Sequence, residues 1–328
     1  MWYSTAGCIV MLTLSLLTAP LAARARSPAK MPRIGYMSLS AGPTRVVEVF
    51  KQGLRDLGWI EGQTIAIEYR WAAGQVDRLP ALAAELVRLQ VDLIVAEGGG
   101  PVIQVAKDAT TSIPIVMVSV ADPVRSGLVA SLARPGGNIT GTSNIQPELA
   151  GKKLELLRTL LPTLSRVAFL GYSGGGVPRL FIEDTQDAAE RLGMQLQLVV
   201  IGSVEEMESA FAAMSSERAE ALIVQPLFMP LGQYQRIADL AVKHRLPTIS
   251  DGPPFAEVGG LLSYGADGLA LIRRSAVFVD KILKGAKPGD LPVEQPTKFE
   301  LVINLKTAKA LDVTIPPILL FQADKVIQ

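Results

Sequence analysis

The sequence has almost none of the residues that build thiol or imidazole sites. Its 328 residues include one cysteine, Cys8, and one histidine, His244. An intramolecular disulfide is therefore excluded, and a metal site would need carboxylates alone, yet no DxDxDG calcium loop occurs. The phosphate-loop pattern GxxxxGK[ST] and a GxGxxG after a strand are also missing. We therefore expect neither a metal nor an organic cofactor.

An excess of charge of one sign is lacking too. The chain has 32 basic and 31 acidic residues, and no run of Lys and Arg is longer than a pair. Nothing therefore predicts binding to nucleic acid. What the chain has instead is 49% apolar residues, which at this length predicts a large core and two domains.

Only one long apolar run occurs, and it lies near the N-terminus. Residues 8–23 read CIVMLTLSLLTAPLAA without a charge and lead into the cleavage-like triplet Ala23-Arg24-Ala25. This pattern predicts a secretory signal peptide over residues 1–25, although the leading MWYSTAG lacks the usual basic residue. The alternative is an uncleaved anchor, which still places the rest of the chain outside the cytoplasm. No later apolar run is long enough to span a bilayer.

From Arg33 onward, short β-rich runs alternate with amphipathic helical patterns, which predicts an α/β fold with parallel sheets. Two sets of four runs match in order, since RIGYMSLSA aligns with RVAFLGYSG and VDLIVAEGG with AEALIVQPL. Arg166 follows Arg33 by 133 residues, and Pro247 follows Pro114 by the same number. This repeat predicts two similar Rossmann-like lobes, the alternative being the likeness of any two βαβ halves. The runs are 34–39, 64–69, 92–96, 115–119, 167–170, 195–201, 221–225 and 248–250.

Two further segments connect or follow these sets. RPGGNITGTSN, residues 134–144, is rich in Gly, Asn and Thr and is predicted to be a connecting hinge, with a plain surface loop as the alternative. After Ser250 come GGLLSYG, a helical pattern over 268–283, a strand at 299–303 and a helical tail. Returning across the hinge is one economical way for this late segment to pack.

Ser173 lies in GYSGG, residues 171–175, which fits the GxSxG pattern of a hydrolase nucleophile. A catalytic triad would have to use His244, but that residue ends a predicted helix just before a strand, at the opposite edge of the sheet from Ser173. Ser173 also matches Ser40 in the repeat. A serine that occurs in the same loop of both lobes fits a role in ligand contact better than a role as a nucleophile, which would be needed only once. We expect no enzyme activity; a secreted serine hydrolase using Ser173 is the alternative.

Parallel sheets bind ligands at the carboxyl ends of their strands, so the loops there should line one cleft between the lobes. Hydroxyls and helix-start N–H groups suit a carboxylate, acidic side chains suit an ammonium, and aromatic rings can stack on an apolar group. This combination predicts a zwitterion such as an amino acid. In the alternative, Asp122 and Asp251 cap helices and Tyr264 is core. The candidate ligand-binding residues are Ser38, Ser40, Glu97, Gly98, Gly99, Ser119 and Asp122 in the first lobe, and Tyr172, Ser173, Gln225, Phe228, Asp251 and Tyr264 in the second.

Several longer stretches resemble a known family. They are GLRDLGWIEGQTIAIEYRWAAGQVDRLPALAAELVRLQVDLIVA, IPIVMVSVADPVRSGLVASLARPGGNITG, KLELLRTLLP, GGLLSYG and LPVEQPTKFELVINLKTAKAL. Over nearly all of the mature sequence, the chain resembles the ABC transporter substrate-binding proteins of the tryptophan/tyrosine-type group. Where relatives often have a polar Asn/Pro loop, this sequence has GYSGGG.

The resemblance implies a class I periplasmic-binding fold, in which two lobes close on a ligand and deliver it to an ABC permease in the inner membrane. It also implies discontinuous lobes, with residues 31–142 plus about 265–291 in lobe one and residues 143–264 plus about 292–328 in lobe two. We therefore expect a monomeric periplasmic protein that captures an amino acid or a similar zwitterion or carboxylate. A periplasmic ligand sensor remains the alternative.

Overall fold

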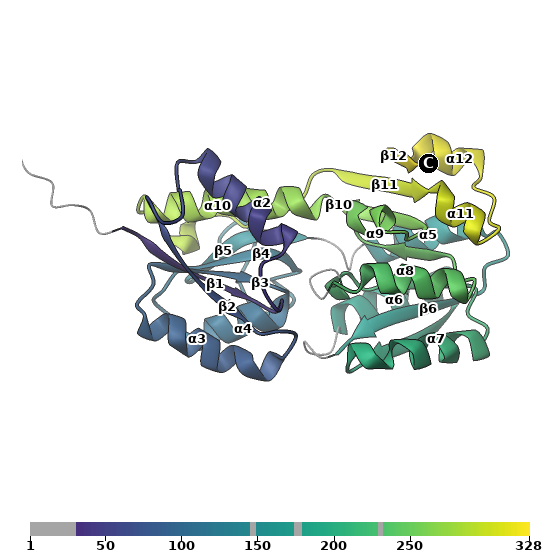
Figure 1. The fold of residues 1–328 in the computed structure, drawn as a ribbon, viewed down its shortest axis with the longest axis horizontal. Coiled ribbons are helices and arrows are strands. Elements are labelled where there is room, and N and C mark those ends of the chain that lie inside the picture. Colours follow the sequence, from purple (N-terminus) through teal and green to yellow (C-terminus); the bar gives the residue numbers. More distant parts are fainter. Residues whose placement is uncertain (1–30, 145–148, 174–178, 229–231) are drawn as a thin grey trace, which may run out of the picture. The chain divides into compact units, whose positions relative to one another are not determined.

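The computed structural model of the protein describes residues 31–144, 149–173, 179–228 and 232–328. The predicted signal peptide lies outside these residues. The described chain forms two separate sheets with helices on their faces, and all strand pairs but one are parallel (Figure 1). The predicted α/β class is therefore confirmed.

Sheet one has five parallel strands in the order β2-β1-β3-β4-β5. Its central strands are buried on both faces, which explains why their sequences are continuous apolar runs. The strands are β1 (Arg33–Ser38), β2 (Ala66–Trp71), β3 (Leu93–Glu97), β4 (Ile115–Ala121) and β5 (Ile139–Asn144). Their connecting helices are α2 (Arg45–Asp56), α3 (Leu79–Arg88) and α4 (Gly100–Ala109), with a short 3-10 turn η1 (Val76–Arg78).

One face of sheet one is covered by helices from both ends of the chain. Helix α10 (Gly268–Leu283) packs against α2 and against β4 and β5 (Figure 1). Phe50 of α2 and Phe278 of α10 are buried there in one core with Tyr36 of β1. Helix α2 ends at Asp56, and Leu57 directly after it is 36% exposed.

Sheet two has seven strands in the order β12-β11-β10-β9-β8-β6-β7, with β10 and β11 antiparallel. The strands are β6 (Arg166–Tyr172), β7 (Gln195–Ile201), β8 (Ala221–Val224), β9 (Thr248–Ser250), β10 (Leu262–Ala266), β11 (Phe299–Asn304) and β12 (Lys325–Ile327). The helices are α5 (Ala150–Leu160), α6 (Arg179–Arg191), α7 (Met207–Ser216), α8 (Tyr234–Lys243), α9 (Pro253–Glu257), α11 (Leu305–Ala310) and α12 (Pro317–Gln322). Short 3-10 turns are η3 (Val204–Glu206) and η4 (Pro226–Phe228), whereas η5 (Pro288–Asp290) contacts β5 of sheet one.

The internal repeat is visible in matching contacts at the start of β1 and β6. The backbone N–H of Arg33 donates to the Asp92 carboxylate at 2.7 Å, and the backbone N–H of Arg166 donates to the Glu220 carboxylate at 2.9 Å. Asp92 directly precedes strand β3, and Glu220 directly precedes strand β8. The same local arrangement therefore begins both sheets.

The predicted hinge loop over residues 134–144 needs correction, because its second half is strand β5. All six residues of β5 are buried, and its outer side is covered by residue 294. The Ser143 N–H donates to the Glu294 carbonyl at 2.8 Å, and the Glu294 N–H donates to the Gly141 carbonyl at 3.0 Å. Backbone pairing rather than an apolar pattern holds this strand, so its sequence resembles a loop.

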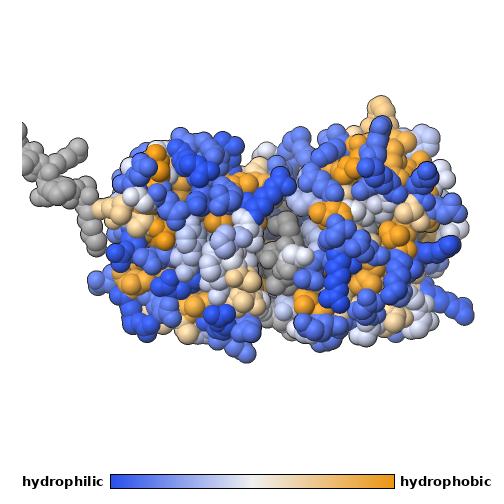
Figure 2. All heavy atoms as spheres, in the orientation of Figure 1, coloured by the Kyte–Doolittle hydropathy of each residue, from blue (hydrophilic) through white to orange (hydrophobic). Residues whose placement is uncertain are grey.

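Within the described ranges, no helix is both long enough and apolar enough to cross a bilayer. Figure 2 shows hydrophobic residues in small groups between hydrophilic ones on the viewed face. Scattered apolar side chains of this kind are normal on folded proteins.

Strand β5 requires a glycine at position 141. Gly141 has φ +137°, and a methyl group added there would lie 2.1 Å from the Met117 carbonyl oxygen. We expect Gly141→Ala to lower the free energy of unfolding by roughly 3 kcal/mol, because overlap and an unfavourable φ act together. Chemical denaturation measures the change. Gly268→Ala is the control, since its methyl meets nothing within 4 Å; equal stability of the two variants would contradict the packing of β5 on β4.

Candidate functional site

Three predicted residues meet at the carboxyl end of sheet one. Ser38 ends β1 and lies in register with Glu97, which ends β3. The Ser38 hydroxyl donates to the Glu97 carboxylate, and the Ser40 backbone N–H donates to the Ser38 hydroxyl oxygen at 3.1 Å. All three side chains are buried. We call Ser38, Ser40 and Glu97 the Ser38 cluster.

The Glu97 carboxyl is buried without a cationic partner in the described chain. Burial raises its pKa, and the hydrogen bond from Ser38 acts in the opposite direction. Gly98 and Gly99 follow directly with φ +113° and +95°, values that glycine adopts without strain. Gly99 is the N-cap of α4, so backbone N–H groups at a helix start lie next to the cluster in sequence.

Ser119 of β4 contacts the neighbouring strand β5, and Asp122, directly after β4, contacts its own turn. The Ser119 N–H donates to the Thr142 hydroxyl at 2.9 Å. The Asp122 carboxylate accepts from the Arg125 backbone N–H at 2.9 Å and lies 3.6 Å from the Arg125 guanidinium. The contact stabilises the turn at residues 123–127, and in the described chain no helix directly follows Asp122 for it to cap, contrary to what the alternative had predicted.

In sheet two, the ends of β6 and β8 are joined by one side chain. The Gln225 carboxamide oxygen accepts from the Tyr172 backbone N–H at 2.8 Å. The Tyr172 and Phe228 rings lie 5.9 Å apart, and Phe228 is fully buried, so its ring presents no surface to a ligand in this structure. Ser173 donates through its backbone N–H and its hydroxyl to the Ile201 carbonyl, at 2.9 and 3.2 Å.

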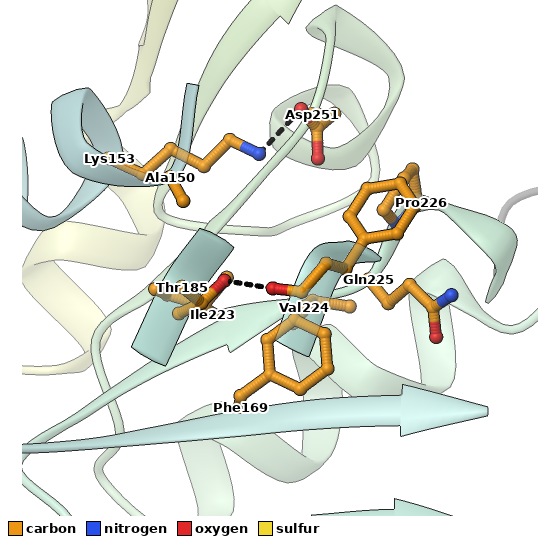
Figure 3. A pocket seen from close by; sticks show the side chains of 10 residues that line it. Ala150, Lys153, Phe169, Thr185, Ile223, Val224, Gln225, Pro226 and Asp251 are labelled. Atoms are coloured by element: carbon orange, nitrogen blue, oxygen red, sulfur yellow. Dashed lines mark hydrogen bonds and ion pairs between the residues drawn. The ribbon is translucent and has the colours of Figure 1, made fainter. Parts of the chain in front are cut away.

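Asp251, at the end of β9, has a partner that the sequence reasoning missed. The Lys153 ammonium of α5 lies 2.6 Å from the Asp251 carboxylate, and their side chains are 3% and 2% exposed (Figure 3). Burial raises the pKa of Asp251, and the charge of Lys153 opposes this shift. Lys153 lies on the buried stripe of α5 that includes Leu157 and Leu160. A lysine on the apolar stripe of a helix is the sequence signal from which a buried ion pair could have been predicted.

A small pocket adjoins this ion pair at the carboxyl end of sheet two (Figure 3). The cavity has room for about one water molecule. In this form it admits a single polar group rather than a whole amino acid. Its lining residues are Ala150, Lys153, Phe169, Phe181, Thr185, Ile223, Val224, Gln225, Pro226 and Asp251.

Tyr264 and His244 lie apart from these clusters. The Tyr264 ring faces Phe299 at 6.4 Å and packs against the core of sheet two, as the alternative reading expected. His244 caps the end of α8, where its Nδ1 lies 2.8 Å from the Ser215 hydroxyl. His244 precedes β9 whereas Ser173 follows β6, so the two lie at opposite ends of a parallel sheet. Among the described residues, no group of three His, Cys, Asp or Glu side chains is placed to hold a metal.

A protein family and several known proteins are similar to this chain. A family model described as ABC transporter substrate binding protein matches residues 41–327. A tyrosine-binding protein from Clostridioides difficile (strain R20291) is 28% identical over 285 residues, which are 86% of this chain and 81% of that protein.

Solved structures are similar to this chain as well. The ABC domain from Streptococcus pneumonia in complex with L-Trp is 27% identical, with a TM-score of 0.80 over 90% of this chain and 99% of that one. A conserved domain protein from Vibrio cholerae O1 biovar El Tor str. N16961 is 25% identical, with a TM-score of 0.82 over 90% of this chain and 100% of that one. A 5-methylthioribose transporter solute binding protein from Thermotoga lettingae TMO shares the fold at 16% identity, with a TM-score of 0.58 over 88% of this chain and 98% of that one.

The buried Glu97 carboxylate should make the protein less stable as the pH rises. Because burial raises its pKa in the folded state, the folded protein keeps a proton that the unfolded chain has already lost. The free energy of unfolding should fall as pH rises from the ordinary value of 4.5 through the folded pKa. Glu97→Gln should remove this fall and unfold at a higher temperature near neutral pH, as measured by thermal unfolding across the pH range.

The exposed Glu217 gives a control with the same change of charge. Glu217→Gln should keep the pH dependence of the parent protein. If Glu97→Gln also keeps it, the carboxyl of Glu97 is not a destabilising buried charge.

Proposed function

Because the chain belongs to the ABC transporter substrate-binding proteins, we propose that it is the extracytoplasmic solute-binding component of an importer. It captures an amino acid, or a similar zwitterion or carboxylate, between two lobes and delivers it to an ABC permease in the inner membrane. The protein acts in the periplasm as a monomer, after removal of its signal peptide.

The observation that carries this proposal is the Glu97 carboxylate. It is 7% exposed at the carboxyl end of β3, it accepts from the Ser38 hydroxyl, and no described lysine or arginine lies within 4 Å of it. Burying a carboxylate without a cation costs free energy. The ammonium group of a ligand would supply the missing positive charge at the edge where parallel sheets bind their ligands.

The carboxylate of the same ligand has a suitable binding place next to Glu97. Helix α4 begins directly after Gly98 and Gly99, and no side chain caps its N-terminus. Residue 101 is a proline and the Val102 N–H donates to the Gly99 carbonyl at 3.1 Å, so the positive end of the helix dipole is what attracts an anion there. One zwitterion can therefore place its ammonium at Glu97 and its carboxylate at the start of α4. The tyrosine and L-Trp named for the relatives belong to this chemical class.

Closure of the lobes would complete the site. We take residues 31–142 with about 265–291 as lobe one and 143–264 with about 292–328 as lobe two. The Arg125 guanidinium, in the loop after β4, pairs with Asp184 of α6 at 2.9 Å and with Glu183 at 3.4 Å. These exposed pairs contribute about 1 kcal/mol or less each. A ligand that contacts both lobes would therefore decide the equilibrium between open and closed forms.

Binding of an aromatic amino acid should stabilise the protein. At a concentration of about 100 Kd, L-tryptophan or L-tyrosine should raise the unfolding temperature by roughly 5 °C, because the ligand binds only the folded state. Thermal-shift measurements against the amino acids and small carboxylates test this. Indole-3-propionate, which lacks the ammonium, and L-tryptophanamide, which lacks the carboxylate, should each give a smaller shift. The absence of a shift with every aromatic amino acid would overturn this substrate class.

The same carboxylate gives a sharper test of the ammonium site. Glu97→Gln should weaken L-tryptophan binding by roughly tenfold or more, because a hydrogen bond to a charged group contributes about 1.5–3 kcal/mol. Its affinity for indole-3-propionate should not fall. Isothermal titration calorimetry measures both, with Glu217→Gln as the control. An equal loss of affinity for the two ligands would show that Glu97 does not bind the ammonium group.

A further inference from the structure

An aromatic stack in sheet one ends in the same row as Ser38 and Glu97. Trp71 is the last residue of β2 and lies in register with Ser38, which lies in register with Glu97 on its other side. Residues in register on neighbouring parallel strands point to the same face, with the strands about 5 Å apart. Trp71, Ser38 and Glu97 therefore form one row across the carboxyl ends of three strands.

The stacking of Trp71 leaves one of its faces directed toward the ligand edge. Tyr69 lies two residues earlier on the same face of β2, and its ring is stacked on the indole at 5.4 Å with an interplanar angle of 10°. Tyr69 therefore covers the indole face that looks back along the strand. The opposite face looks beyond the carboxyl end of the strand, where parallel sheets bind ligands. The Trp71 side chain is partly exposed, so some of its surface is open.

A buried hydroxyl lies beside this stack. The Tyr36 ring lies 5.9 Å from both Tyr69 and Trp71, on the same face of the sheet. Its hydroxyl is buried and has no hydrogen-bond partner among the residues that the structure describes. Burial raises the pKa of Tyr36, and the nearby Glu97 charge raises it further. A ring surface, a carboxylate and an unused hydroxyl thus gather at one end of sheet one.

We propose that Trp71 selects ligands that carry an aromatic ring. The ligand ring lies on the open face of the indole and extends the Tyr69–Trp71 stack by one ring, while the ligand ammonium contacts Glu97. Trp71 and Glu97 are two strands apart, about 10 Å between backbones, and their side chains shorten this gap to the length of an aromatic amino acid. The inference rests on the proposed function and adds the class of ligand side chain to it.

The aromatic residues predicted from the sequence are less suited to this role. Phe228 is fully buried, and Tyr172 is 6% exposed and packs on Phe228. Tyr264 packs on Phe299 and the core of sheet two. The Trp71 indole, in contrast, is stacked on Tyr69 through one of its faces. Trp71 also belongs to the row of residues that contains Glu97.

Two substitutions at Trp71 separate ring stacking from bulk. Trp71→Leu should weaken binding of L-tryptophan, L-tyrosine and L-phenylalanine by roughly threefold to tenfold, the range expected for loss of one aromatic pair. It should leave L-leucine binding within about twofold, and Trp71→Phe should restore most of the aromatic affinity. Calorimetric titration measures these constants. Trp59→Phe is the matched control, because Trp59 bonds to Asp280 elsewhere and should keep the parent's preference.

A spectroscopic readout tests direct contact and does not depend on the leucine variant folding. L-phenylalanine, or L-leucine if that binds, should change the tryptophan emission of the parent and of Trp59→Phe, but not that of Trp71→Phe. An emission change that persists in Trp71→Phe overturns the proposal.

The outcomes also separate this inference from the proposed function. If the parent binds amino acids or carboxylates but Trp71→Leu keeps the parent's ratio of aromatic to aliphatic affinity, the role of Trp71 is overturned and the proposed function stands. If the parent binds no amino acid and no small carboxylate, the proposed function itself is overturned.

Discussion

The parallel register of β2, β1 and β3 is the constraint on which the candidate site depends. Backbone hydrogen bonds place the last residues of the three strands side by side, so that Trp71, Ser38 and Glu97 share one row and one face. A slip of one residue would turn the Glu97 carboxylate to the other face of the sheet. The chemistry of the cluster therefore follows from strand pairing deep in the lobe rather than from the loops that surround it.

Equivalent positions in the two lobes carry different side chains with different hydrogen-bond partners. In the internal repeat, Glu97 of lobe one matches Gln225 of lobe two. The Gln225 amide is neutral and accepts from a backbone N–H, whereas Glu97 is an acid that accepts from a hydroxyl. Lobe two keeps its buried acid, Asp251, one strand further along and pairs it with Lys153. One lobe thus pairs its buried carboxylate with a lysine, while in the other no described lysine or arginine lies within 4 Å of the buried carboxylate.

Sequence patterns predicted what depends on local periodicity and missed what depends on distant pairing. Apolar runs and amphipathic stretches located most strands and helices, and the repeat located the loops at the carboxyl ends of the strands. Strand β5 was missed because Gly141 and its polar neighbours are buried by backbone pairing with β4 and residue 294. Lys153 was missed because nothing near it in the sequence shows its partner Asp251. The role proposed for Trp71 was missed because an aromatic residue at a strand end resembles any core residue until its stacking is known.

The return of α10 to sheet one has a consequence for how the chain folds. Phe278 and Val279 complete the core that Tyr36 and Phe50 begin, so the first sheet needs residues made more than two hundred positions later. This gives the first lobe a high contact order, which slows folding. During synthesis from the N-terminus, that lobe must stay incomplete until α10 emerges, after every strand of the second lobe except β11 and β12. The crossing that links the lobes therefore also delays the moment at which the first of them can become native.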